Sequence, residues 1–227
     1  MTKVDIISGF LGAGKTTLIR KLIKEGYGDK KIILIENEFG EIGVDTGFLK
    51  DTGVTINEMT AGCICCTLVG DFAKALNQVM EEYNPDVIVI EPSGVGKLSD
   101  VIIAVQDIDN KNLLLNSFAT VVDAKKAKKY LKNFGEFFKN QVENASCIIL
   151  SHTADMTEEK IDEVVKVMRG LNHAATLVTT DWKELSGADL LSAMEQKNSL
   201  NAELEKLREE AYRELEEHEH HHHDHEH

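Results

Sequence analysis

The sequence has 227 residues and a mass of 25.3 kDa, a length that suits one domain with an appendage. Hydrophobic residues make up 42% of the chain and only two prolines occur, which excludes general disorder and a Pro-rich linker. Its net charge of -14 makes nucleic acid and membrane surfaces poor partners. The apolar runs are strand-sized and no signal-peptide pattern is present, so we expect a cytoplasmic protein with reduced cysteines.

Short β-branched segments alternate with amphipathic segments along the chain. This alternation is typical of an α/β fold, a mostly parallel sheet flanked by helices. In chain order, the sequence predicts strand 3–8, helix 15–25, strand 31–36, helix 67–83, strand 86–91, strand 117–123, a helical region near 124–144, strand 147–151, helix 157–170 and strand 175–179. We expect these elements to form one domain over residues 1–197.

The last thirty residues differ in character from the rest. Residues 198–217 are predicted to form an amphipathic helix, with leucines from Leu200 to Leu215 on one stripe; it would pack as a lid or meet a partner. Residues 218–227 are predicted to be a disordered metal-loading tail, with an expression tag as the alternative. The histidines of this tail are His218, His220, His221, His222, His223, His225 and His227.

Residues 9–16, GFLGAGKT, match the phosphate-binding pattern GxxxxGK[ST] between a predicted strand and a predicted helix. The glycines let successive N–H groups point at the β-phosphate. Lys15 would place its charge between the β- and γ-phosphates, and the Thr16 hydroxyl would bind Mg²⁺. The predicted phosphate-binding residues are Gly9, Gly12, Ala13, Gly14, Lys15, Thr16 and Thr17.

Glu91 ends the hydrophobic strand 86–91. An acid at this position can hold Mg²⁺ directly or through water, although an ordinary strand-end acid is the alternative. Together with the glycine loop, this strand predicts a nucleoside triphosphatase in which Lys15 and Glu91 are catalytic.

Three thiols, Cys63, Cys65 and Cys66, lie just before the predicted helix 67–83, whose N-terminal dipole would favour thiolates. Such a cluster suits a soft or borderline cation, and acids of the segment 36–41, including Glu38, could complete the site. We favour zinc, with cobalt and nickel left open, as are a redox dithiol and structural cysteines. Cys147 is expected in the core.

Four segments, GFLGAGKTT, ENEFGEIGVD, GCICC and EPSG, occur in this order. In this respect residues 3–180 resemble the CobW family of metallochaperone GTPases, relatives of the nickel-insertion GTPases of hydrogenase and urease. The resemblance implies a SIMIBI-class P-loop fold, Mg²⁺-dependent GTP hydrolysis, a nucleotide-linked dimer and delivery of a transition metal to a client protein. The implied roles are a nucleotide-sensing switch for Glu38 and Asp45, with Asp45 in the catalytic set, the Walker B acid for Glu91, and metal ligands for Cys63, Cys65 and Cys66.

The segment expected to read guanine departs from the family pattern NKxD or SKxD. Here residues 151–155 read SHTAD, so His152 replaces the lysine and Ala154 replaces the aspartate. An aspartate there accepts two hydrogen bonds from guanine, and its loss removes the main discriminator against adenine unless Asp155 reaches the base. Ser151, His152 and Asp155 are the candidate base contacts, and ATP remains an alternative to GTP.

A typical CobW protein also continues into a second, C-terminal domain, where this chain shows only the predicted helix and tail. We therefore expect client recognition on the GTPase body or on residues 200–215. Another open alternative is a His-rich metal buffer with a residual nucleotide site.

Overall fold

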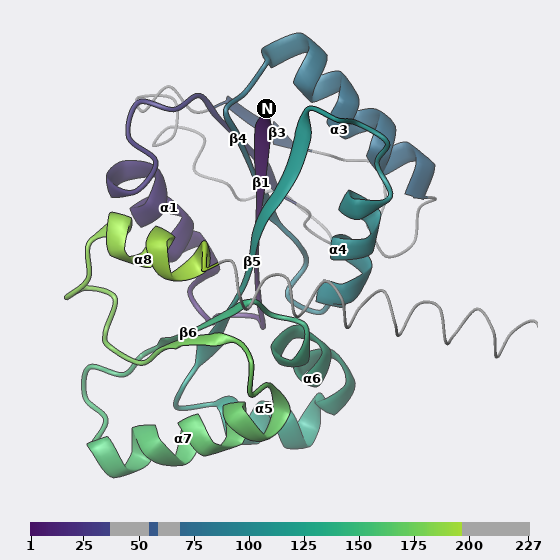
Figure 1. Cartoon of the computed structure of the whole chain (residues 1–227). Helices are drawn as coiled ribbons and strands as arrows, with labels where there is room; N and C mark the ends of the chain where they lie inside the picture. Colours follow the sequence, from purple (N-terminus) through teal and green to yellow (C-terminus); the bar gives the residue numbers. More distant parts are fainter. Residues whose placement is uncertain (37–54, 59–68, 197–227) are drawn as a thin grey trace, which may run out of the picture.

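The computed structural model of the chain describes residues 1–36, 55–58 and 69–196 (Figure 1). Within them, a seven-stranded sheet has the order β3-β2-β4-β1-β5-β6-β7, and all neighbouring strands are parallel. The strands are β1 (Thr2–Gly9), β2 (Ile32–Glu36), β3 (Thr55–Glu58), β4 (Val87–Glu91), β5 (Leu113–Asp123), β6 (Cys147–Ser151) and β7 (Thr176–Val178). The helices are α1 (Lys15–Glu25), α3 (Val69–Tyr83), α4 (Leu98–Gln106), α5 (Ala127–Asn133), α6 (Gly135–Glu143), α7 (Glu158–Leu171) and α8 (Gly187–Met194).

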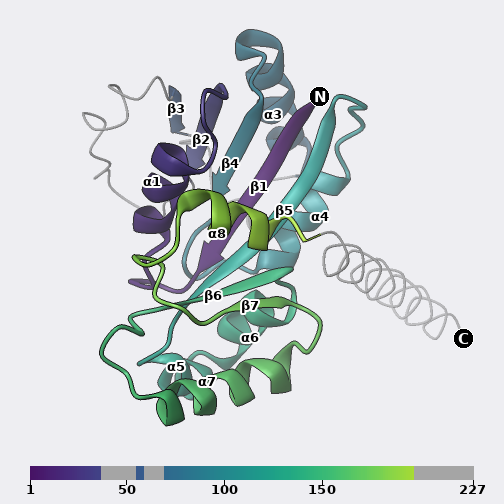
Figure 2. The ribbon, with the colours of Figure 1, turned by 60° about the vertical axis from the view of Figure 1, so that its left-hand side comes forward.

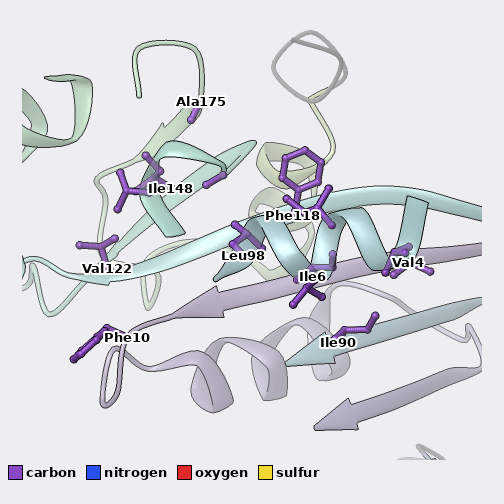
Figure 3. Packing of buried hydrophobic residues seen from close by; sticks show 14 of the residues in the cluster. Val4, Ile6, Phe10, Ile90, Leu98, Phe118, Val122, Ile148 and Ala175 are labelled. Atoms are coloured by element: carbon purple, nitrogen blue, oxygen red, sulfur yellow. The ribbon is translucent and has the colours of Figure 1, made fainter. Parts of the chain in front are cut away.

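Helices cover both faces of the sheet (Figure 2). The apolar residues of α1 and α8 share one core cluster with Ile7 of β1, whereas α3, α4, α6 and α7 contribute to the cluster that contains Ile6. Neighbouring residues of β1 therefore point into two separate cores, which explains why this strand is apolar on both faces. Figure 3 shows part of the second cluster, where Val4 and Phe118 of the central strands lie with Leu98 of α4.

The predicted α/β fold is confirmed, with one correction among its helices. The single helical region expected near 124–144 is two helices, because Phe134 between them leaves the helical region at φ −133° and ψ 37°. The Phe134 ring lies 4.8 Å from that of Phe10, so tertiary packing overrides a locally helical sequence. The elements β3, α4 and α8 were not predicted; five of the nine residues of α4 are buried, which obscures its helical period.

The predicted helix over 198–217 and the His-rich tail over 218–227 lie outside the described residues. Among the helices of the described ranges, none has the length and apolar character needed to cross a membrane.

The carboxyl ends of the strands meet at one edge of the sheet because all of the strands are parallel. In the ladders, Gly9 pairs with Val121 and Asp123 pairs with Ser151, while Glu36 pairs with Glu91. The loops that follow β1, β4, β5 and β6 consequently leave from the same edge. This is the edge at which open α/β sheets bind their ligands.

Candidate nucleotide site

The loop between β1 and α1 has the backbone conformation that its glycines permit. Gly9 has a φ of +152°, and a Cβ there would lie 2.6 Å from the Val121 carbonyl oxygen. Gly14, the N-cap of α1, has a φ of +105°. Between them, the N–H of Ala13 donates to the Phe10 carbonyl at 3.1 Å and closes the turn. The loop thus leads into the helix N-terminus, where free N–H groups favour phosphate.

Lys15 folds back over this loop. Its side chain is buried, and Nζ donates to the carbonyl oxygens of Gly9 at 2.8 Å and Phe10 at 3.4 Å. The ammonium is therefore held inside the loop, at the position where a phosphate would be cradled.

Thr16 and Glu91 meet across the gap between α1 and β4. The Thr16 hydroxyl lies 3.4 Å from Oε1 of Glu91. A hydroxyl and a carboxylate form an oxygen donor set of the kind that Mg²⁺ takes alongside water and phosphate oxygens. These two residues fit the predicted Mg²⁺ site, and Glu36, the register partner of Glu91, ends the neighbouring strand β2.

The EPSG segment after β4 is fixed by two contacts that the sequence did not predict. A Cβ on Gly94 would lie 3.0 Å from the backbone nitrogen of Leu11, so a glycine here lets this loop approach the phosphate loop closely. On the other side, Nε2 of the buried Gln141 donates to the carbonyls of Gly94 and Gly96, each at 3.0 Å. The loop that begins at Glu91 is therefore held between the phosphate loop and α6.

The segment 151–155, at the end of β6, contacts the phosphate loop through its first residue. The Ser151 hydroxyl donates to the Ala13 carbonyl at 2.6 Å. His152 has a left-handed φ of 58°, and its Nε2 lies 3.9 Å from Oδ2 of the buried Asp123. Asp155 is bound instead by Lys125 at 2.6 Å, and this hydrogen bond lowers the pKa of the Asp155 carboxyl. The structure thus brings Ser151 to the predicted site and pairs Asp155 with a lysine.

The remaining predicted metal and switch residues lie outside the described ranges. These residues are Glu38, Asp45, Cys63, Cys65, Cys66, His218, His220, His221, His222, His223, His225 and His227. Within residues 1–36, 55–58 and 69–196, no group of three or more His, Cys, Asp or Glu residues could hold a metal. Cys147 is confirmed as a core residue, and burial raises the pKa of its thiol to about 12.

Trp182 is a residue of this region that sequence reasoning missed. It follows β7 in a segment without helical or strand periodicity, and its ring reaches the start of α1. A Cβ on Gly14 would lie 2.8 Å from Cη2 of Trp182. The only feature of the sequence that could have drawn attention to this residue is that it is the single tryptophan of the chain.

Comparisons with known proteins identify the family of the chain. The family model for the nucleotide-binding domain of CobW/HypB/UreG matches residues 3–179. The zinc chaperone YjiA of Escherichia coli is 34% identical over 168 residues, covering 70% of this chain and 52% of YjiA. The zinc chaperone CobW of Sinorhizobium sp is 43% identical over 127 residues, covering 52% of this chain and 36% of that protein. The chain thus spans about half or less of the length of these curated relatives.

Solved structures show the same fold. The Zn(II)-bound YjiA GTPase from E. coli superposes with a TM-score of 0.59 at 27% identity, covering 78% of this chain and 56% of that one. HypB from Helicobacter pylori in complex with nickel gives a TM-score of 0.55 at 22% identity over 91% of this chain and 87% of that one, a likeness of fold alone. With its phosphate loop, strand-end acid and matched residues 3–179, the chain belongs to the CobW/HypB/UreG family of P-loop proteins.

Proposed function

We propose that this protein is a nucleotide-dependent metallochaperone that hydrolyses GTP and uses the cycle to bind a transition metal and deliver it to a client protein. The observation that carries the proposal is the contact of Thr16 with Glu91 beside the folded-back Lys15. This arrangement supplies the charge and the oxygen ligands that Mg²⁺-triphosphate hydrolysis requires.

The residues of this chain would divide the chemistry between them. Bound Mg²⁺ would neutralise charge that develops on the phosphates. The Lys15 ammonium would stabilise the β- and γ-phosphate oxygens, and the N–H groups at the start of α1 would hold the β-phosphate. Gln141 would keep the loop after Glu91 in place through its two hydrogen bonds.

The sheet register supports a link between phosphate chemistry and metal binding. Glu58 at the end of β3 pairs with Glu36, which pairs with Glu91. The acidic segment 37–54 therefore leaves β2, and the cysteine segment 59–68 leaves β3, at the same sheet edge as the nucleotide site. Loss of the γ-phosphate would release the switch around Glu38 and Asp45 and weaken the metal site at Cys63, Cys65 and Cys66.

Zinc is the metal that we propose, with cobalt and nickel as alternatives, because the cited relatives are named zinc chaperones. The His-rich tail would load metal for the cysteine site. We place this work in the cytoplasm, where thiols stay reduced, and propose a nucleotide-dependent homodimer that meets a client metalloprotein.

ATP is a second candidate nucleotide, and a specific observation favours it. Ala154 occupies the place of the guanine-reading aspartate, and Asp155 is engaged by Lys125. Alanine has no carboxylate, and that of Asp155 is already paired with a lysine, so neither residue supplies an unpaired carboxylate to accept the two hydrogen bonds that guanine donates.

The test is the zinc affinity of the chain shortened to end at Glu217, measured by chelator competition without nucleotide, with a Mg²⁺-GTP analogue and with a Mg²⁺-ATP analogue. We expect the GTP analogue to shift the affinity by about 1–3 kcal/mol, the usual size of coupling between sites. Lys15→Ala is the control and should lose this shift together with phosphate release. Identical zinc affinities under all three conditions would contradict the coupling.

The buffer alternative makes a different prediction for the same shortened chain. If the tail carries the function, the full chain binds several ions and the shortened chain loses most of them. Zinc stoichiometry measured on both chains distinguishes the two functions.

A further inference from the structure

Trp182 lies against the loop that would bind the phosphates. A Cβ on Gly14 would lie 2.8 Å from Cη2 and 3.1 Å from Cζ2, both atoms of the six-membered ring. The edge of the indole therefore contacts the backbone at the N-cap of α1. A side chain at position 14 would displace the indole, in addition to the strain that the positive φ of this residue would impose.

The segment that carries Trp182 forms a turn that is tied to α1 at its C-terminal end. Leu185 N–H donates to the Trp182 carbonyl at 3.3 Å, and Glu184 N–H donates to the Asp181 carbonyl at 2.9 Å. Further on, Gly187 N–H donates to Oε2 of Glu25 at 3.1 Å, which ties the start of α8 to the end of α1. Figure 2 shows α8 alongside α1. The indole is thus positioned by the fold.

The segment 151–155 also contacts the phosphate loop, close to Trp182. Ile149 of β6 pairs with Val178 of β7, so residues 151–155 and the segment leading to Trp182 leave adjacent strands at one edge. The Ser151 hydroxyl binds the Ala13 carbonyl, one residue from the contact of Trp182 with Gly14. Both segments therefore meet the end of the phosphate loop, at the two residues that precede α1.

The indole packs partly against the core cluster that holds the apolar residues of α1, and the rest of its surface stays exposed beside this loop. Stacking on an aromatic ring tolerates any base, because every base has a π face. We propose that Trp182 forms one wall of the nucleobase site and stacks on the purine of the bound nucleotide. This inference rests on the proposed nucleotide binding and adds that base affinity comes largely from stacking, which suits GTP and ATP alike.

The fluorescence of the wild-type chain gives the first test, since Trp182 is its single tryptophan. GDP and ADP, each with Mg²⁺, should quench this fluorescence well beyond any change caused by Mg²⁺-tripolyphosphate, which has no base. Equal changes with GDP and tripolyphosphate would overturn the stacking role.

Calorimetric titration of variants gives the second test. Trp182→Ala should weaken GDP and ADP binding by about tenfold each, within the range of base–aromatic stacking, and leave tripolyphosphate binding unchanged. Trp182→Phe should keep most of the GDP affinity. The matched control is Glu184→Gln, an exposed neighbour in the same segment, which should bind GDP as the wild type does.

Retention of wild-type GDP affinity by Trp182→Ala would overturn the inference while leaving nucleotide binding intact. Failure of the wild-type chain to bind GDP, ADP and tripolyphosphate would overturn both the inference and the proposed function. If Trp182→Ala unfolds, as thermal denaturation would show, Trp182→Phe and the wild-type fluorescence still decide the question.

Discussion

A buried carboxylate in β1, four residues before the phosphate loop, is the centre of a polar network. Asp5 is fully buried and accepts hydrogen bonds from Tyr27 Oη at 2.8 Å, Asn116 Nδ2 at 2.8 Å and Ser117 Oγ at 2.6 Å. Asn116 also donates to Glu195 at 2.8 Å, so the network joins the core of the sheet to the end of α8. Burial raises the pKa of Asp5, and the three donors oppose this rise.

Replacement of Asp5 by alanine should destabilise the fold markedly. Asn116 keeps its bond to Glu195, but the hydroxyls of Tyr27 and Ser117 lose the acceptor. At about 1–3 kcal/mol for each buried donor left without a partner, Asp5→Ala should cost roughly 2–6 kcal/mol. Asp5→Asn keeps the shape and one carbonyl acceptor, and the Tyr27 hydroxyl can rotate to accept from the new amide, so its cost should be under about 1.5 kcal/mol.

The pH dependence of stability in wild type and in Asp5→Asn separates the effect of the Asp5 charge from that of its shape. Because the folded-state pKa of Asp5 is raised, folding favours the protonated carboxyl. Its contribution is full below the ordinary value of 3.8 and is lost as pH rises through the raised pKa. Wild type should therefore gain stability relative to Asp5→Asn as pH falls from 7 towards 4.

Urea denaturation of wild type, Asp5→Asn and Asp5→Ala at a series of pH values provides the measurement. The reasoning would be wrong if Asp5→Asn lost as much stability as Asp5→Ala at pH 7. It would also be wrong if wild type lost stability relative to Asp5→Asn on acidification, because that sign requires a lowered pKa in the folded state.

Three further predictions concern the nucleotide site. Lys15→Ala should lower GTP hydrolysis, measured as phosphate release, by about 100-fold or more, because the charge inside the loop is lost; Lys24→Ala at the other end of α1 is the control. Glu91→Gln should raise the Mg²⁺ concentration needed for half-maximal hydrolysis by about tenfold, and an unchanged Mg²⁺ dependence would remove Glu91 from the ion site. Gln141→Leu deletes two hydrogen bonds to the loop after β4, so it should cost about 2 kcal/mol in urea denaturation and reduce hydrolysis in parallel; full activity would show that this loop needs no such support.

Local sequence predicted the parts of the site that depend on contiguous residues. The glycine loop, Lys15 and the strand ending in Glu91 could be placed because their spacing fixes their chemistry. Gln141, Gly94 and Trp182 could not, because each acts through a contact with a residue distant in the chain. The helix break at Phe134 has the same cause, since its ring packs on Phe10.

The pairing of β3 with β2, which the sequence did not predict, supports the proposed coupling between the nucleotide site and the cysteine segment. Neighbouring strands lie about 5 Å apart, so the backbone of Glu58 lies roughly 10 Å from that of Glu91, with Glu36 between them. Cys63 follows Glu58 by five residues, which extend at most about 18 Å. The strand that leads into the cysteine segment therefore ends two strands away from Glu91, at the same edge of the sheet. In the proposed function, a metal held by the cysteines would respond to the γ-phosphate through these strand ends and the segment between β2 and β3.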